Sequence, residues 1–566
     1  MQRASFALLI RYHLTIQATV RANHLTFHER KVAAQGEDMV SHLVAVRRPE
    51  LVIGLTGPIG VNIEQANKYI QNEMRLYGYD PVTIKLTDEM QIIQTSIDIS
   101  DDDYIQRYND LIDYANEVRI KTKTPEMLAI LAISAIRRER LARYRLQNAL
   151  DDATGVTQVP PLEGVVYIIR QLKRPEEVDL LRNVYGDQFI LVAIHTTHDG
   201  QVEYLKSKTI QKGPGSYNED VLDQSITRLI NRDLKETNPP ERPQSKPDES
   251  SKRYVETKFG QNILDTFPKG EVFVSSNSDE AIKRFFKVFF GFKGTSPAED
   301  EYGMYLAKAA SLRSLDLSRQ VGAAIIGSDG SIVSLGCNEV PKAKGGIYGD
   351  GDTNDKRDFQ MGYDPNEREK RRVLHDLISR LKHENLLNDA RLGNKDLDQI
   401  LADALDSDDI LTIRDSRLMD IIEFGRVIHA EMHALTEAAR VGRAVAGATL
   451  YCTTFPCHLC AKHIVASGIA RVVYIEPYAK SYARALHSDS ISIEESAENK
   501  VLFSPFLGIS PYRYRTLFEE GRRKDKNGSI KSWSHDERIP RLEVYVQKHD
   551  FNEDRVLDAF KSLLDP

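Results

Sequence analysis

Cysteine and long apolar runs are both scarce in this sequence of 566 residues. Only four cysteines occur, too few for the disulfide framework that stabilises small secreted proteins. The apolar run at 7–10 is interrupted by Arg11 and His13, which makes it too short for a signal-peptide core or a membrane span. We therefore expect a cytoplasmic protein with no membrane partner.

An excess of positive charge is also missing. The formal net charge is −7 and the pI is about 6.2, so no global basic surface gathers nucleic acid, and any such contact must be local. Hydrophobic residues at 41% and charged residues at 28% are ordinary for a globular protein. The length exceeds what one hydrophobic core usually serves, so we expect at least two domains.

The first half of the chain alternates between strand and helix patterns. A buried strand at 50–56 is followed by a glycine turn, an amphipathic stretch at 62–77 and a second strand at 82–86, which is the order of a βαβ unit. Short β-branched runs at 165–169 and 189–194 flank a helical segment. This alternation predicts an α/β domain built on a parallel sheet.

The composition divides the chain into four parts. The stretch 236–251 is rich in Asn, Pro, Glu, Ser and Lys and is interpreted as a solvated excursion within the first domain, because helix and strand patterns resume after it. A hairpin pattern at 321–326 and 332–336 indicates that a second domain, with a fold different from the first, has begun. The predicted parts are a disordered or mis-started extension (1–38), the first domain (45–288), the second domain (290–545) and a C-terminal tail (546–566).

A glycine-rich turn follows the first strand and opens the first helix. Gly54, Gly57 and Gly60 are placed where backbone N–H groups cradle phosphates in nucleotide-binding loops. However, Asn62, Ile63 and Glu64 replace the final glycine, lysine and hydroxyl residue of the phosphate-loop pattern. We predict nucleotide binding at the three glycines without phosphoryl transfer, and leave open a sensor, oligomerisation or scaffold role.

The strongest chemical pattern lies in the second half. It combines HAE at 429–431 with PCHLC at 456–460, which matches the H-x-E and P-C-x-x-C signature of zinc deaminases. His429, Cys457 and Cys460 are predicted to bind zinc and to leave the fourth position open for water. Glu431 is predicted to act as the proton shuttle. A redox pair or structural zinc knuckle is disfavoured, because the single C-x-x-C is accompanied by the H-x-E pattern.

Local patterns support this metal site. Helices at 427–441 and 457–467, the second directly after a strand at 448–452, are predicted to begin at the metal, where their positive ends favour thiolates. Cys337 and Cys452 lie in apolar strands and are interpreted as small buried hydrophobes. His433 lies one helical turn after the predicted ligand His429, but a packed or hydrogen-bonded role is favoured over a second ligand.

Four stretches, at 312–323, 336–341, 429–433 and 453–461, resemble the deoxycytidylate deaminase branch of the cytidine deaminase superfamily. The resemblance implies an α/β/α sandwich. It also implies that Asn338 contacts the substrate sugar or base and that the backbone at Ala430 reads the pyrimidine edge. From its position after a strand alone, Asn338 is also a typical turn residue.

The whole arrangement resembles bacterial anti-phage deoxycytidine-nucleotide deaminases, including glycine-rich and charged stretches at 345–348, 355–359 and 362–364. This implies a degenerate P-loop kinase-like domain ahead of the deaminase. It also implies conversion of dCTP or dCMP to dUTP or dUMP, which depletes the dCTP pool that an infecting phage needs. Expected partners are the nucleotide substrate, further copies in a homo-oligomer, and an inhibitory RNA or nucleotide regulator. Candidate phosphate-binding residues are Arg319, Lys342, Lys344, Arg357 and Lys480.

Two other functions remain as alternatives. In the first, the chain is a base deaminase acting on RNA or single-stranded DNA, which its acidic composition disfavours. In the second, it is mainly a regulatory nucleotide or RNA sensor.

Overall fold

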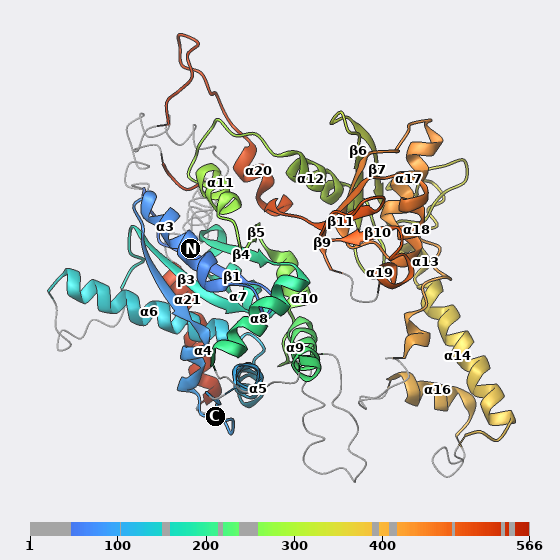
Figure 1. Ribbon diagram of the computed structural model, residues 1–566, viewed down its shortest axis with the longest axis horizontal. Helices are drawn as coiled ribbons and strands as arrows, with labels where there is room; N and C mark the ends of the chain where they lie inside the picture. Colours follow the sequence, from blue (N-terminus) through green and yellow to red (C-terminus); the bar gives the residue numbers. More distant parts are fainter. Residues whose placement is uncertain are drawn as a thin grey trace, which may run out of the picture.

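The computed structural model contains two α/β bodies, each built on a six-stranded sheet (Figure 1). It describes residues 47–101, 103–149, 159–212, 219–236, 259–387, 395–406, 416–477, 481–533, 538–542 and 549–564. The predicted extension at 1–38 lies outside these residues. No helix in the described parts of the chain is long and apolar enough to cross a membrane.

The first sheet has the strand order β12-β5-β4-β1-β3-β2, and all of its strands are parallel except β12. Its central strands are buried along their length, as expected for a parallel sheet covered on both faces. This confirms the predicted α/β class. The strands are β1 (Leu51–Thr56), β2 (Asp80–Lys85), β3 (Val165–Leu172), β4 (Phe189–His195), β5 (Val272–Ser275) and β12 (Gly508–Ile509).

Helices cover both faces of this sheet. One face packs on α3 (Ile63–Leu76) and α11 (Glu280–Phe289), and the opposite face packs on α6 (Met127–Gln147) and α7 (Pro175–Tyr185). The amphipathic stretch predicted at 62–77 and the helical segment predicted between the runs at 165–169 and 189–194 therefore form the expected helices. The remaining helices of this body are α4 (Leu86–Glu89), α5 (Tyr104–Thr122), α8 (His198–Lys212), α9 (Glu219–Leu234) and α10 (Ile263–Thr266).

The second sheet has the order β10-β11-β9-β8-β6-β7, in which β6 runs antiparallel to both of its neighbours. The predicted hairpin is the β6–β7 pair. Two helices that carry the zinc motif, α17 (Ala430–Arg440) and α18 (His458–Ala466), cover one face, and α12 (Glu299–Ser311) covers the other. The strands are β6 (Gly322–Ile326), β7 (Ile332–Cys337), β8 (Thr449–Thr454), β9 (Arg471–Glu476), β10 (Ile491–Ile493) and β11 (Val501–Pro505).

An insertion between β7 and α17 extends away from the second sheet (Figure 1). It contains α13 (Asp358–Met361), α14 (Pro365–His383) and α16 (Leu397–Asp406). A small core that includes Leu374, Ile378 and Ile400 holds α14 against α16. The short helices α19 (Ala483–Leu486) and α20 (Tyr514–Phe518) follow β9 and β12.

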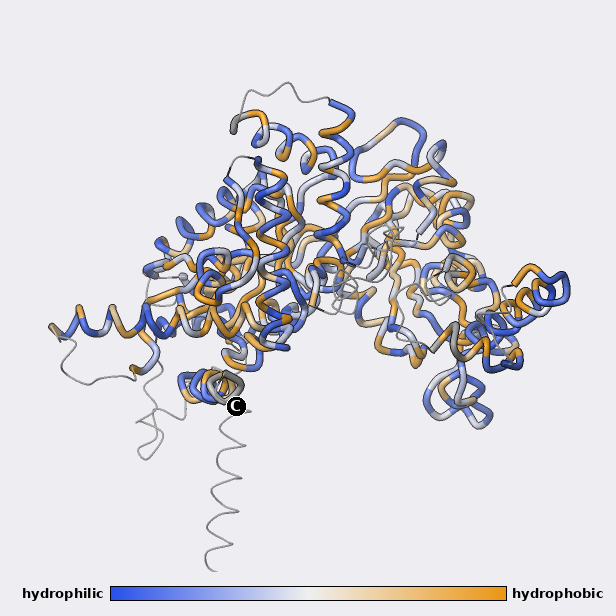
Figure 2. The backbone as a smooth tube through the Cα atoms, turned by 90° about the horizontal axis from the view of Figure 1, so that it is seen from below, coloured by the Kyte–Doolittle hydropathy of each residue, from blue (hydrophilic) through white to orange (hydrophobic). Residues whose placement is uncertain are grey.

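The two sheets share a hydrophobic core. Ala193 and Phe273 of the first sheet cluster with Met304 of α12 and Ile326 of the second sheet. After β11 the chain returns to the first body, where β12 pairs with β5. In the view of hydropathy in Figure 2, hydrophobic residues run through the interior of both bodies, and hydrophobic and hydrophilic residues alternate along the outlying segments.

The last described helix, α21 (His549–Leu564), packs against α6 and α7 of the first body. Its residues Val556, Leu557 and Phe560 contact the core beneath those helices. The segment predicted as a tail at 546–566 is therefore largely a packed helix, because one of its faces is apolar. Likewise, β12 falls within the predicted second domain but completes the edge of the first sheet.

A buried ionic cluster fastens α21 to the first body. The Arg140 guanidinium, 1% exposed, lies 2.6 Å from a Glu50 oxygen and 2.7 Å from a Glu553 oxygen. His549 Nε2 lies 2.9 Å from the same Glu50 carboxylate. Burial raises the pKa of Glu50, but the hydrogen bond to His549 and the Arg140 charge outweigh it and lower the pKa below its usual 4.5. The stabilisation from Glu50 is thus present at neutral pH and is lost as the pH falls below 4.5.

Replacing Arg140 with methionine is expected to destabilise the protein by about 3–5 kcal/mol, because two buried carboxylates lose their counter-charge. Chemical denaturation followed by circular dichroism measures this change. Arg138→Met is the matched control, since Arg138 lies on the same helix but pairs with Glu89 with 59% of its side chain exposed. Equal shifts in both variants would show that the buried cluster contributes nothing beyond a surface ion pair.

Candidate active site and metal centre

The three predicted zinc ligands are brought to one place by the starts of two helices. His429 is the residue immediately before α17, and Cys457 is the residue immediately before α18. Cys460 lies in the first turn of α18. Both helices therefore begin at the metal centre, as the sequence predicts, and their unpaired N–H groups give this corner a positive potential.

The donor atoms fit a tetrahedral zinc ion. His429 Nδ1 lies 3.3 Å from Cys457 Sγ and 3.4 Å from Cys460 Sγ, and all three donor atoms lie within 4.8 Å of one another. Ligands bound to zinc at about 2.0–2.3 Å in tetrahedral geometry lie roughly 3.3–3.8 Å apart. The set of one imidazole and two thiols also matches the chemistry that zinc prefers.

The surroundings favour the thiolate form of Cys457. Hydrogen bonding to Cys460, together with the His429 imidazole, lowers the pKa of the Cys457 thiol to about 4. The same contact with Cys457 raises the pKa of His429 to about 9. A thiolate is the form of cysteine that binds metal, and a bound ion would displace the proton that His429 shares with Cys457.

A second group of ionisable residues, Glu50, His549 and Glu553, also has donor atoms close enough to share an ion. The Arg140 guanidinium already lies between both carboxylates. Arg140 therefore supplies the positive charge that these carboxylates need, and the cluster does not require a metal ion.

Glu431 lies two residues after His429, in the first turn of α17, and its side chain is only 4% exposed. It lines a cavity of about 250 Å³ together with Ala430, His429 and Cys457. Burial raises the pKa of its carboxyl. The structure thus places Glu431 beside the metal ligands, in the wall of a space open to a small molecule.

Asn338 lines the same cavity but is also engaged with the main chain. Its Nδ2 donates to the Arg319 carbonyl at 2.8 Å, and its Oδ1 accepts from the Val321 N–H at 2.7 Å. Gly336, two residues earlier, lets β7 approach α17, since a Cβ there would lie 2.2 Å from the Ala430 carbonyl oxygen. Asn338 therefore holds the 319–321 loop at the cavity, and contact with substrate stays a prediction.

The predicted phosphate-binding cations are scattered. Arg319 lines the cavity. Lys342 instead pairs with Asp352 at 3.0 Å and Arg357 with Asp355 at 2.6 Å. Lys344 is exposed and does not line the cavity, and Lys480 lies outside the described residues.

Three acidic residues of the cavity wall, Asp316, Asp358 and Asp364, lie in stretches that the sequence analysis named for their family resemblance and not as site residues. The last two come from the long insertion, whose path across the site no local pattern indicates.

The remaining thiols and the nearby histidine behave as predicted. Cys337 and Cys452 are buried, and burial raises the pKa of Cys337 to about 11. Neither belongs to the metal cluster found among the described residues. His433 is 4% exposed, and its Nδ1 accepts the Cys337 N–H at 3.0 Å, so it is a packed, hydrogen-bonded histidine.

The glycine turn of the first body is arranged differently from the prediction. Gly54 lies within β1 and packs against Leu172 and Phe189, where a Cβ would approach their side chains to 2.6–2.9 Å. Gly57 and Gly60 lie in the turn and line a cavity. No local pattern in the sequence indicates Asp233 of α9, whose carboxylate accepts the Ile59 N–H of this turn at 2.7 Å. Nucleotide binding at the glycines stays a prediction.

Comparison with known proteins bears on the second body. Residues 297–476 match the family described as the cytidine and deoxycytidylate deaminase zinc-binding region. The deoxycytidylate deaminase of Enterobacteria phage T2 is 52% identical over 54 residues, which are 10% of this chain and 29% of the phage protein. ComE operon protein 2 of Bacillus subtilis is 38% identical over 72 residues, 12% of this chain and 38% of that protein. The chain thus spans less than two thirds of the length of either relative.

Among solved structures, the dCMP deaminase of cyanophage S-TIM5 in complex with dCMP and dUMP aligns with 38% of this chain and 100% of its own, at 19% identity and a TM-score of 0.21. The family match covers both halves of the zinc motif, and the structure brings those halves together around one corner. The family match does not extend to the N-terminal parallel sheet. The C-terminal half of this chain therefore contains a cytidine and deoxycytidylate deaminase zinc-binding domain.

Proposed function

We propose that the protein catalyses the zinc-dependent hydrolytic deamination of free deoxycytidine nucleotides, dCTP or dCMP, to the corresponding uracil nucleotides. In this reaction water replaces the amino group at C4 of the cytosine ring, and ammonia leaves. The observation that carries the proposal is the placement of Glu431 in the same cavity wall as His429 and Cys457.

Each side chain of the site has a distinct task in this chemistry. His429, Cys457 and Cys460 would hold zinc, and zinc when bound lowers the pKa of water enough to make it a nucleophile at neutral pH. Glu431 takes a proton from the attacking water, delivers it to the ring nitrogen and then assists the departure of ammonia. Burial of Glu431 keeps bulk water away from these proton transfers.

Three observations support a free nucleotide rather than a polynucleotide as substrate. The net charge of −7 provides no broad basic surface for a nucleic-acid strand. The phage T2 relative is named a deoxycytidylate deaminase, and the exposed Arg319 lies at the cavity where a phosphate would need a counter-charge. We further propose that consumption of dCTP serves anti-phage defence by starving the replication of an invading genome.

The proposal is tested by incubating the purified, zinc-loaded full chain separately with dCTP, dCMP, CTP, single-stranded DNA and tRNA. Chromatography of the products then detects the uracil form of each compound. We expect uracil nucleotide from dCTP or dCMP. Product from DNA or tRNA alone would replace the proposal with a polynucleotide deaminase, and absence of product from every compound would refute it for the isolated chain.

A further inference from the structure

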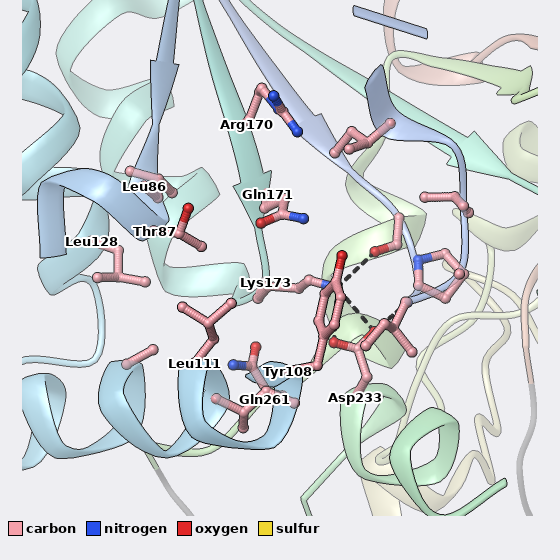
Figure 3. Close-up of a pocket in the computed structure, with 18 of the residues that line it drawn as sticks. Leu86, Thr87, Tyr108, Leu111, Leu128, Arg170, Gln171, Lys173, Asp233 and Gln261 are labelled. Atoms are coloured by element: carbon pink, nitrogen blue, oxygen red, sulfur yellow. Dashed lines mark hydrogen bonds and ion pairs between the residues drawn. The ribbon is translucent and has the colours of Figure 1, made fainter. Parts of the chain in front are cut away.

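The first body contains a second cavity, of about 320 Å³, at the carboxyl ends of β1 and β3 (Figure 3). The chain leaves β1 through α3 and leaves β3 through α7, and these two helices cover opposite faces of the sheet. Adjacent parallel strands whose connections diverge in this way leave a crevice, which is where ligands bind in open α/β sheets. The volume lies near the lower end of the range of about 300–1,000 Å³ for small-molecule sites.

The end of this cavity formed by the glycine turn already holds an anion from the protein itself. The Asp233 carboxylate, 1% exposed, accepts the Ile59 N–H at 2.7 Å. Lys173 Nζ donates to both Asp233 oxygens at 2.8 and 2.9 Å and to the Gly57 carbonyl at 3.0 Å. Asp233 therefore occupies the position that a phosphate takes on such a turn, and its salt bridge with Lys173 leaves neither group available to a phosphate.

Two glutamine carboxamides also line the cavity (Figure 3). Gln261 is 5% exposed, and its Oε1 is buried with no hydrogen-bond partner among the residues that the structure describes. A buried polar atom left without a hydrogen bond destabilises the folded protein. Such a cost in a cavity wall points to a ligand that supplies the missing donor.

Gln171 lies in the wall of the same cavity as Gln261 (Figure 3). Its backbone has φ +71°, in the left-handed region, at the point where the β1–β3 register shifts. A residue other than glycine is held there at an energetic cost, and such residues cluster at binding sites. The shift in register presents a second carboxamide to the cavity.

The space between these polar groups is lined by flat and apolar side chains. Leu86, Leu111 and Leu128 contribute aliphatic surface, and Tyr108 contributes an aromatic ring. Carboxamides pair with the hydrogen-bonding edges of nucleobases, and aromatic and aliphatic walls suit their faces.

We propose that this cavity binds an unphosphorylated nucleoside, with its base against Gln261 and Gln171. The corresponding triphosphate is rejected, because Asp233 occupies the position on the glycine turn that its phosphates would take. The site is separate from the zinc centre. The inference does not depend on the deaminase activity proposed above.

Isothermal titration calorimetry on the full chain tests the proposal with thymidine, deoxyadenosine and deoxyguanosine and with their 5′-triphosphates. These ligands lack the cytosine amine, so they are not substrates of the proposed reaction. We expect one nucleoside per chain to bind and its triphosphate to bind at least tenfold more weakly. A failure of all three nucleosides to bind at millimolar concentration, or equal or tighter binding of the triphosphate, would overturn the proposal.

Variants locate the bound nucleoside. Gln261→Leu is expected to weaken its binding by about tenfold, the effect of one lost hydrogen bond. Gln360→Leu is the matched control, since Gln360 is exposed in α13 of the other body. Thermal unfolding of each variant shows whether the fold is retained. Unchanged binding in Gln261→Leu, or equal losses in the two variants, would place the ligand elsewhere.

Discussion

Glu431→Gln is expected to lower the rate of deamination by about 10²–10⁴-fold, the usual contribution of a general acid–base group. Glutamine keeps the size of the side chain but neither accepts the proton of water nor returns one to the ring nitrogen. The zinc ligands are unchanged, so the zinc content measured by mass spectrometry should stay at the level of the unaltered protein. Steady-state assays at saturating nucleotide give the turnover number.

Glu437→Gln provides the matched control for this experiment. Glu437 lies on the same helix, α17, but its carboxylate accepts from Arg440 at 2.5 Å, away from the cavity. We expect its turnover to remain within a factor of two or so of the unaltered protein, as for most surface substitutions. Equal losses in both variants, or full activity of Glu431→Gln, would remove Glu431 from the proposed mechanism.

Cys460→Ala is expected to abolish both zinc binding and deamination. Two protein ligands hold zinc far more weakly than three, and without the ion the pKa of water returns from about 7 toward 15.7. Activity should therefore fall below detection. Because Cys460 is fully buried in the core beneath β8 and α18, the melting temperature should fall as well.

Cys337→Ala separates loss of metal from loss of a buried thiol. The Cys337 side chain is 1% exposed and lies outside the metal cluster. We expect this variant to keep zinc and activity with a modest loss of stability, since only a small buried group is removed. Retention of stoichiometric zinc by Cys460→Ala would contradict the assignment of Cys460 as a ligand.

Local patterns in the sequence were sufficient to predict much of the fold and of the candidate metal site. The runs that became β1, β3 and β4 are short and β-branched, and their burial on both faces leaves no other stable arrangement. The zinc cluster could equally be predicted from sequence, because its ligands lie at the starts of two helices and their spacing follows from helix geometry. The position of His429 is set by helix α17, which follows it, and that of Cys457 by helix α18.

Contacts between distant segments could not be predicted in this way. Asp233 reaches the glycine turn from a helix whose own pattern is that of an ordinary amphipathic surface helix. Gly54 was interpreted as part of a phosphate cradle, although close packing against Leu172 and Phe189 explains it. β12 comprises only Gly508 and Ile509, so it has no periodicity to recognise and is defined by pairing with β5 alone.

The return of the chain to the first sheet changes how truncated alleles should be interpreted. A stop codon placed directly after β11, which ends at Pro505, spares every zinc ligand and all six strands of the second sheet. It nevertheless deletes the edge strand β12 and leaves Arg140 without Glu553 and His549. A null phenotype from such an allele would reflect collapse of the amino-terminal body, and geneticists should map catalysis with point substitutions instead.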